Sequence, residues 1–145
     1  MTQVMGSLLD MSAAELDALF AASSCGEIPT GRGRGTVLYG TGTRRARPAA
    51  AAARVVLWQG KHFRSETHDL QNLLTPFGVH AVRADVYEGE SHFDGSPAIV
   101  LDYSKTSWIA RDVRDEMRQI GPHEYLGIVF RRSERAPVHF LLTFA

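Results

Sequence analysis

Residues 81–87 read AVRADVY, residues 97–103 read PAIVLDY, residues 124–132 read EYLGIVFRR and residues 137–144 read PVHFLLTF. Each segment is rich in β-branched, aromatic or aliphatic residues and is bounded by turn-forming residues, which predicts a β-strand. Most of the segments carry apolar residues on both alternating faces. This pattern is typical of a sheet that is covered on both sides or closed into a barrel. We therefore predict a mainly β fold, in the form of a small antiparallel β-barrel.

The length and charge of the chain limit its class. Its 145 residues correspond to a single domain, in which residues 1–53 are predicted to be helical and loop and residues 54–145 mostly strands. Sixteen basic and sixteen acidic side chains cancel, so the chain has no overall field that would attract nucleic acid. No apolar run approaches the ~20 residues of a membrane-spanning helix. Neither a nucleic-acid partner nor a membrane span is expected.

Cysteine usage and the N-terminal sequence predict the compartment. The single cysteine, Cys25, cannot form an intramolecular disulfide, and the N-terminus lacks the basic region and apolar core of a secretion signal. These features predict a cytoplasmic protein. They do not determine the oligomeric state, and a homodimer is compatible with them.

Two short helices are predicted in the N-terminal part. Ser12 and Glu15 have the spacing of a capping box, which predicts a helix of about three turns that packs on a flank of the sheet. Residues 23–35, SSCGEIPTGRGRG, are predicted to be an irregular loop. Pro48 is followed by five alanines, which predicts a second helix that runs into residues 55–57.

The charged segment 108–119 is compatible with a helix or a strand. As a helix, it would place oppositely charged side chains four residues apart on a solvated face. As a strand, it would place Arg114, Glu116 and Arg118 on one face. If that face pointed into a barrel, the charges would have to be paired, because an unpaired buried charge costs several kcal/mol.

Residues 57–63, LWQGKHF, and a second group of positions resemble a known set of proteins. The second group consists of Leu101, Asp102, Tyr103, Ile109, Asp112, Arg114 or Arg118, Ile120, Tyr125, Leu126 and Gly127. Together they loosely resemble small bacterial proteins of unknown function that carry a GxWxG-type domain. Such proteins are lipocalin-like β-barrels, so the resemblance implies a ligand cavity. It implies neither a particular ligand nor a catalytic residue.

Asp102 is the first candidate for chemistry because it ends the most apolar strand of the chain. It can pair with an arginine such as Arg111 or Arg114, or it can cap the turn at residues 104–106. Alternatively, burial raises its pKa and makes it a general acid or base. If the protein is an enzyme, we expect Asp102 and Tyr103 to be catalytic.

Aromatic and charged side chains are the candidates for binding. Tyr87 and Tyr103 are predicted to face each other across the hairpin of residues 81–87 and 97–103. We expect an apolar, aromatic or lipid-like small molecule inside the barrel. The predicted ligand-binding residues are Trp58, Phe77, Tyr87, Arg111, Arg114, Arg118 and Phe140.

Two alternative functions stay open. The first is an isomerase, cyclase or dehydratase that uses acid–base chemistry on the same scaffold. The second is a structural or interaction protein whose interior is filled by its own side chains. The sequence does not decide whether a reaction is catalysed.

No metal site and no cofactor are predicted. The histidines lack the spacing of a metal site, and His139 is predicted to share a face with Leu141 and Thr143. Nothing near Cys25 lowers its pKa toward reactivity, because it follows a helix end instead of preceding a helix. No serine occupies a Gly-x-Ser-x-Gly turn.

Overall fold

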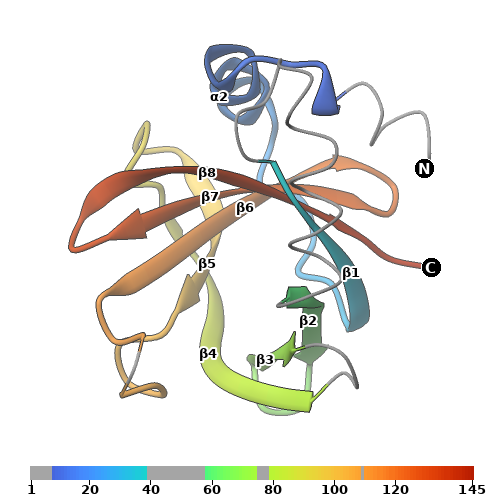
Figure 1. The fold of residues 1–145 in the computed structure, drawn as a ribbon, viewed down its shortest axis with the longest axis vertical. Helices are drawn as coiled ribbons and strands as arrows, with labels where there is room; N and C mark the ends of the chain where they lie inside the picture. The colour runs from blue at the N-terminus through green and yellow to red at the C-terminus, as the bar shows by residue number, and fades with distance from the viewer. Residues whose placement is uncertain (1–7, 39–57, 75–78, 109) are drawn as a thin grey trace.

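The computed structural model describes residues 8–38, 58–74, 79–108 and 110–145, and the strands in this part of the chain form a closed barrel. Each strand pairs antiparallel with the next, and β8 closes the ring by pairing with β1 (Figure 1). The strands are β1 (Gly31–Val37), β2 (Trp58–Arg64), β3 (Asp69–Leu74), β4 (Val79–Glu90), β5 (Pro97–Asp102), β6 (Val113–Gly121), β7 (Glu124–Arg131) and β8 (Glu134–Thr143). The prediction of a mainly β antiparallel barrel is confirmed.

Apolar residues on both faces of the strands have two different surroundings. In β5, Ile99 and Leu101 belong to a cluster inside the barrel, which also contains Met117 of β6. Ala98 of the same strand belongs to a second cluster on the outer face, together with residues of the N-terminal helix. The inner face fills the closed sheet and the outer face is covered by the helix, so both of the predicted causes of the two-sided pattern operate.

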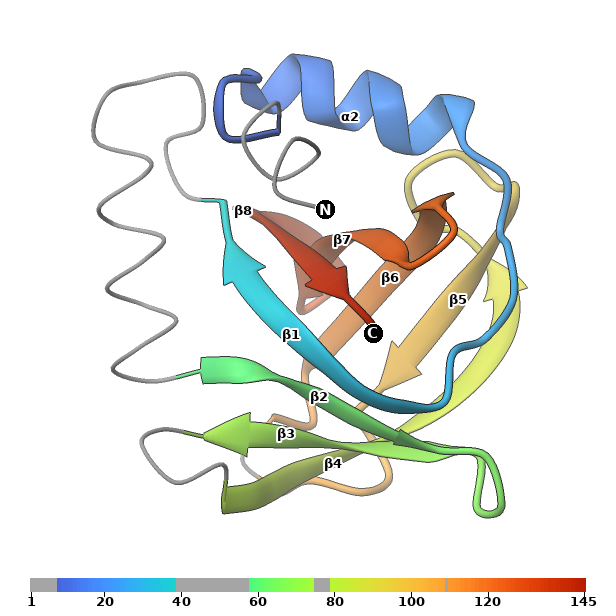
Figure 2. The same ribbon diagram turned by 90° about the vertical axis from the view of Figure 1, so that its right-hand side faces the viewer.

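The helix α2 (Ala13–Ala22) lies across the outside of the barrel, beside β7 and β8 (Figure 2). Both hydrogen bonds of the predicted capping box are present, because Ser12 accepts from the Glu15 amide and Glu15 accepts from the Ser12 amide. Leu16 and Phe20 are buried against the outer face of the sheet, with Leu141 of β8. The predicted first helix and its packing on a flank are therefore confirmed.

Of the secondary-structure elements that the described residues form, one is a helix, α2, and the others are strands. The second predicted helix, which would start at Pro48, lies outside the described residues. None of the described helical structure is long and apolar enough to cross a membrane.

The predicted loop over residues 23–35 is wrong in its second half, because β1 begins at Gly31. Glycine weakens a strand, but here it allows close approach. The ring of Phe144 lies against Gly33, and a Cβ there would overlap it. Gly60 of β2 has a φ of 143° and sits so close to the Gly33 carbonyl that no side chain fits. Neighbouring strands and an aromatic ring thus stabilise a segment whose local sequence favours a loop.

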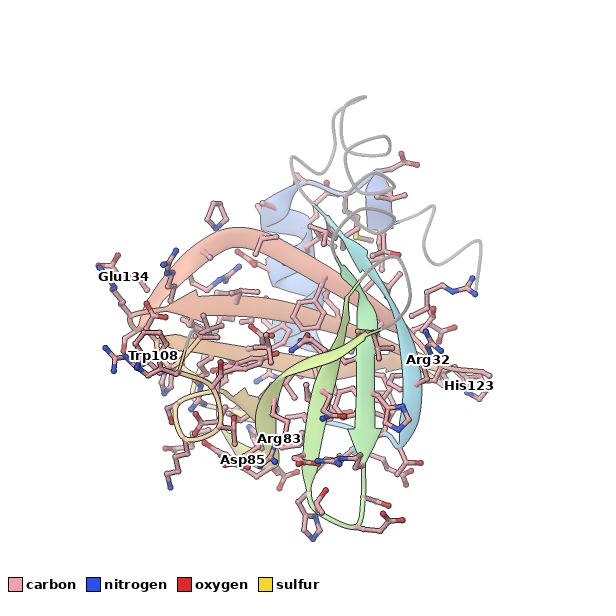
Figure 3. The ribbon with its side chains drawn as sticks, turned by 60° about the horizontal axis from the view of Figure 1, so that its bottom comes forward. Arg32, Arg83, Asp85, Trp108, His123 and Glu134 are labelled. Atoms are coloured by element: carbon pink, nitrogen blue, oxygen red, sulfur yellow. The ribbon has the colours of Figure 1, made fainter. Side chains whose placement is uncertain are left out.

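The helix-or-strand alternative for residues 108–119 is resolved in favour of a strand from Val113 onward. Along β6, Asp115 and Met117 point into the barrel, and Glu116 and Arg118 point outward to the loops and the helix. Before this strand, Trp108 is 83% exposed and lies at the periphery of the molecule (Figure 3).

Candidate functional site

Four polar side chains meet inside the barrel, and we call them the inner polar cluster: Lys61 of β2, Asn72 of β3, Tyr103 directly after β5, and Asp115 of β6. The strand register brings them together, because Lys61 pairs with Asn72 and Leu101 pairs with Asp115. All four are buried, and Lys61 is only 3% exposed. A lysine this deeply buried is rare unless it is paired.

Short hydrogen bonds connect the inner polar cluster. Lys61 Nζ donates to Tyr103 Oη at 2.7 Å and to Asn72 Oδ1 at 2.8 Å. It also forms an ion pair with Asp115 Oδ2 at 3.2 Å. Asn72 Nδ2 donates to Tyr103 Oη at 2.9 Å and to the Val82 carbonyl at 2.8 Å. Because the Tyr103 oxygen accepts from Lys61 and Asn72, its own proton points to Asp115 Oδ2, 3.4 Å away.

Burial and charge act against each other on the pKa values of the cluster. Burial lowers the pKa of Lys61, but the attraction of Tyr103 and Asp115 outweighs it, so the pKa lies above the ordinary value. Burial raises the pKa of Asp115 above its ordinary value, and the Lys61 ammonium offsets this rise only in part. Burial also raises the pKa of the Tyr103 phenol. The cluster therefore holds a protonated amine and a neutral phenol beside a carboxyl group.

Aromatic rings surround the buried amine. Lys61 Nζ lies 5.4 Å from the ring centroid of Tyr103 and 5.4 Å from that of Phe140, which is within the range of a cation–π contact. Phe140 has room because it lies over Gly127 on the neighbouring strand, where a Cβ would overlap the ring. Phe63 and Phe144 continue the aromatic lining, with ring centroids 5.8 Å apart.

Of the predicted site residues with described side chains, Tyr103 and Phe140 point into the barrel and Tyr87 and Asp102 point outward. The prediction that Tyr87 faces Tyr103 is wrong, because Tyr87 pairs with Val100 and is 40% exposed. Tyr87 and Tyr103 lie on opposite faces of the sheet.

Asp102 caps the turn that follows β5, as one of its three predicted alternatives states. It accepts hydrogen bonds from the Ser104 amide at 2.9 Å, the Ser104 hydroxyl at 2.6 Å and the Tyr87 hydroxyl at 2.9 Å. Burial raises the pKa of Asp102, but these hydrogen bonds and Arg114 outweigh it, so the pKa is lowered. The alternative of a raised pKa is wrong for this residue.

The predicted arginines lie outside the barrel interior. Arg118 is fully buried on the outer side of β6, where it binds the Phe20 carbonyl at 2.9 Å and both carboxylate oxygens of Asp94 at 2.7 Å. Arg114 donates to Glu116, and Arg111 is exposed before β6. The side chains of Trp58 and Phe77 lie outside the described part of the structure.

Sequence reasoning missed Lys61, Asn72 and Asp115 as site residues. A usable signal was present for two of them. Lys61 lies two residues before Phe63, and Asp115 lies two residues before Met117. Side chains two residues apart on a strand point to the same face, so each charged residue should point inward with its core neighbour.

The remaining candidates for chemistry lie apart from the inner polar cluster. Burial raises the pKa of Cys25 to about 11, with Glu88 adding to the rise, which agrees with the prediction of an unreactive thiol. Within the described ranges, no group of three or more histidine, cysteine, aspartate or glutamate side chains could hold a metal ion.

Comparison with known proteins identifies a similar fold. No known protein family and no curated protein matches the chain, so the resemblance to proteins with a GxWxG-type domain stays a prediction. The crystal structure of a protein from Thermomonospora curvata is similar to this chain, with a TM-score of 0.61 and 19% identity. The similarity covers 93% of this chain and 88% of that one. At this identity, the match shows that the two chains share a fold.

Proposed function

We propose that the barrel interior binds a small molecule with an apolar or aromatic body and a neutral polar group, as in lipocalin-like barrels. The observation that carries this proposal is the buried Lys61 ammonium, which meets Tyr103, Asn72 and Asp115 among aromatic side chains. A binding site of this class combines an apolar lining with a few convergent polar groups.

The ion pair inside the barrel supports a role in binding, because stability alone is in general a weak reason for a buried ion pair. Well-packed apolar side chains of similar volume are often as stabilising as a buried ion pair, or more so by about 1–4 kcal/mol. The interior of an eight-stranded barrel is just wide enough to be filled by side chains or to hold one small ligand. A charged pair inside so narrow a barrel is well suited to orienting a bound ligand.

The charges of the cluster define the polar group of the ligand. Lys61 and Asp115 balance each other, so a free carboxylate on the ligand would leave an excess negative charge in a medium of low dielectric. A carbonyl oxygen is compatible, because Lys61 and Tyr103 can both donate to it. We therefore assign the ligand to the apolar or aromatic carbonyl compounds.

Native mass spectrometry of the protein purified from its own host tests the proposal, and a retained apolar compound is the expected result. Binding of a fluorescent aromatic ketone should then fall strongly in Lys61→Met. The matched control is Lys105→Met, because Lys105 is the other lysine of the chain and is exposed. Equal binding by both variants, or no retained compound and no ketone binding at all, would favour a filled structural core.

An acid–base enzyme is a second candidate, favoured by the contact of the Tyr103 hydroxyl with Lys61 and Asp115. In this arrangement Tyr103 donates a proton to a ligand carbonyl and Asp115 accepts one from the adjacent carbon. Asp102 lies on the outer face and takes no part. A Tyr103→Phe variant that binds ketones but turns none over would support this candidate; unchanged turnover would exclude it.

A further inference from the structure

We propose that Lys61 captures an aldehyde or ketone ligand covalently as a protonated imine, with Asp115 as its counterion. This inference rests on the proposed binding of a carbonyl compound and deepens it. It assigns a chemical task to a buried amine that the packing of the barrel does not require.

The geometry places the groups that imine formation needs around one nitrogen. Asp115 Oδ2 lies 3.2 Å from Lys61 Nζ and can take a proton from the ammonium. Tyr103 Oη lies 2.7 Å from the same nitrogen. An oxygen bound to a carbon under attack by Lys61 therefore lies within reach of the Tyr103 proton. Asn72 holds the Tyr103 oxygen in place by a hydrogen bond of 2.9 Å.

The reaction balances without any other reactant. The Lys61 ammonium transfers one proton to Asp115, and the free amine forms a C–N bond to the carbonyl carbon. Protons delivered through Tyr103 and Asp115 then reach the former carbonyl oxygen, the C–O bond breaks and one water leaves. Two of the three ammonium hydrogens depart in that water, and the third stays on the nitrogen of the protonated imine.

The charge of the interior is the same before and after the reaction. One positive charge on nitrogen faces one carboxylate in both states, so the buried pair of Lys61 and Asp115 needs no new counterion. The rings of Tyr103 and Phe140, each 5.4 Å from the nitrogen, also stabilise a cation at this position. The surrounding buried apolar residues limit the access of water, which would hydrolyse the product.

Reductive trapping tests the inference directly. The protein is incubated with cinnamaldehyde and sodium cyanoborohydride, digested and mapped by mass spectrometry. We expect Lys61 to be labelled at least about tenfold faster than Lys105, because the high effective concentration of a positioned amine toward a bound carbonyl outweighs the smaller free-amine fraction that the raised pKa of Lys61 gives. Without the reductant, a protonated imine should also give a red-shifted absorption band.

Two variants separate chemistry from folding. Lys61→Arg keeps the positive charge but cannot form an imine, so it should lose the label and the absorption band. Asp115→Asn removes the counterion and should shift that band. The folded state of each variant is verified by circular dichroism, and the wild-type comparison of Lys61 with Lys105 requires no variant at all.

The possible outcomes distinguish the two proposals. If native mass spectrometry shows cinnamaldehyde bound but Lys61 is labelled no faster than Lys105, the imine is refuted and noncovalent binding stands. If no carbonyl compound enters the barrel and Lys61 stays unlabelled, both proposals fail. Faster labelling of Lys61 with the absorption band supports both.

Discussion

Two sets of buried charges lie on opposite sides of the same strand, β6. Inside the barrel, Asp115 faces Lys61 in the inner polar cluster. On the outside, Glu116 and Arg118 are both fully buried, and with their partners Ser91 and Asp94 we call them the outer clamp.

The two sets differ in what they bind. Arg118 binds the backbone carbonyls of Phe20 and Pro97, and Glu116 accepts from the His92 amide. The outer clamp thus fixes the end of α2 and the connection between β4 and β5. The hydrogen bonds and ion pair described for Asp115 are with side chains alone. A structural task explains the outer clamp. In the inner polar cluster, Asn72 donates to the Val82 carbonyl within β4, whereas the other hydrogen bonds and the ion pair described above join side chains to one another, so we assign the function to this cluster.

The largest predicted effect is the loss of Arg118 from the outer clamp. Arg118→Met should lower the free energy of unfolding by roughly 3–5 kcal/mol, because it leaves Asp94 and buried carbonyl groups without their partner. Urea unfolding measures this loss. Arg32→Met, at an exposed position on β1, is the control and should change the free energy by less than about 0.5 kcal/mol (Figure 3). A loss below about 1 kcal/mol at Arg118 would remove the structural explanation of the clamp.

Double variants distinguish the two sets of buried charges. Lys61→Met alone should lower the free energy of unfolding by about 3 kcal/mol, because Asp115 loses its buried partner. The double variant Lys61→Met/Asp115→Leu should regain most of that loss, since apolar residues can replace a buried pair.

The matching double variant in the outer clamp, Arg118→Met/Asp94→Leu, should not recover. The carbonyl groups of Phe20, Ser96 and Pro97 would still lack a donor. Urea unfolding of all four variants decides the matter. Recovery in both pairs, or in neither, would mean that the two sets of charges do not differ as described.

The parts of the fold that the sequence predicts are those in which local and tertiary preferences agree. The capping box at Ser12 begins α2, and the apolar segments after residue 81 form strands. The strand at Gly31–Val37 could not be predicted, because its glycines favour a loop and are stabilised by Phe144 and by the close approach of β2. Tertiary contact overrides local preference there.

The candidate site was predicted less completely than the fold. The sequence predicts Phe140 as a ligand-binding residue and Tyr103 as a catalytic one, and both point into the barrel. Arg114 and Arg118, which it predicts as ligand-binding, lie on the outer face, away from a ligand inside the barrel. The strand face of a charged residue follows from alternation, whereas which face points inward depends on the closure of the whole barrel. A register irregularity between Trp58 and Gly60 interrupts the alternation of β2 before Lys61, so Phe63 alone marks the inner face of this segment.

A smaller effect is expected at the start of α2. Ser12→Ala removes one capping hydrogen bond, that to the Glu15 amide, and should lower the free energy of unfolding by about 1 kcal/mol. Thermal unfolding measures the loss, with the exposed Ser65→Ala as control. Because α2 covers the outer face only, ketone binding in the interior should not change. A parallel loss of binding would show that the helix and the interior are coupled.

The smallest effect is a pH dependence at the contact between α2 and β8. His139 is buried there, with Nε2 2.7 Å from Asp17 Oδ1, and Arg135 binds the same carboxylate at 2.9 Å. Burial lowers the pKa of His139, and Asp17 only partly offsets this. The unfolded chain, with a histidine pKa of about 6.5, therefore binds more protons than the folded one.

Stability must accordingly fall as the pH drops through about 6.5 toward the lower pKa of the folded state. His139→Gln should flatten this slope, since glutamine keeps a hydrogen-bonding group near Asp17 but does not titrate. Thermal unfolding at about pH 7.5 and 5.5 provides the comparison. All other titrating groups are the same in the wild-type protein and in the variant. The difference between their slopes of stability against pH therefore measures the contribution of His139. Parallel slopes would mean that protonation of His139 does not contribute to the pH dependence of stability. A steeper slope in the variant would mean that the pKa of His139 is raised in the folded state, not lowered.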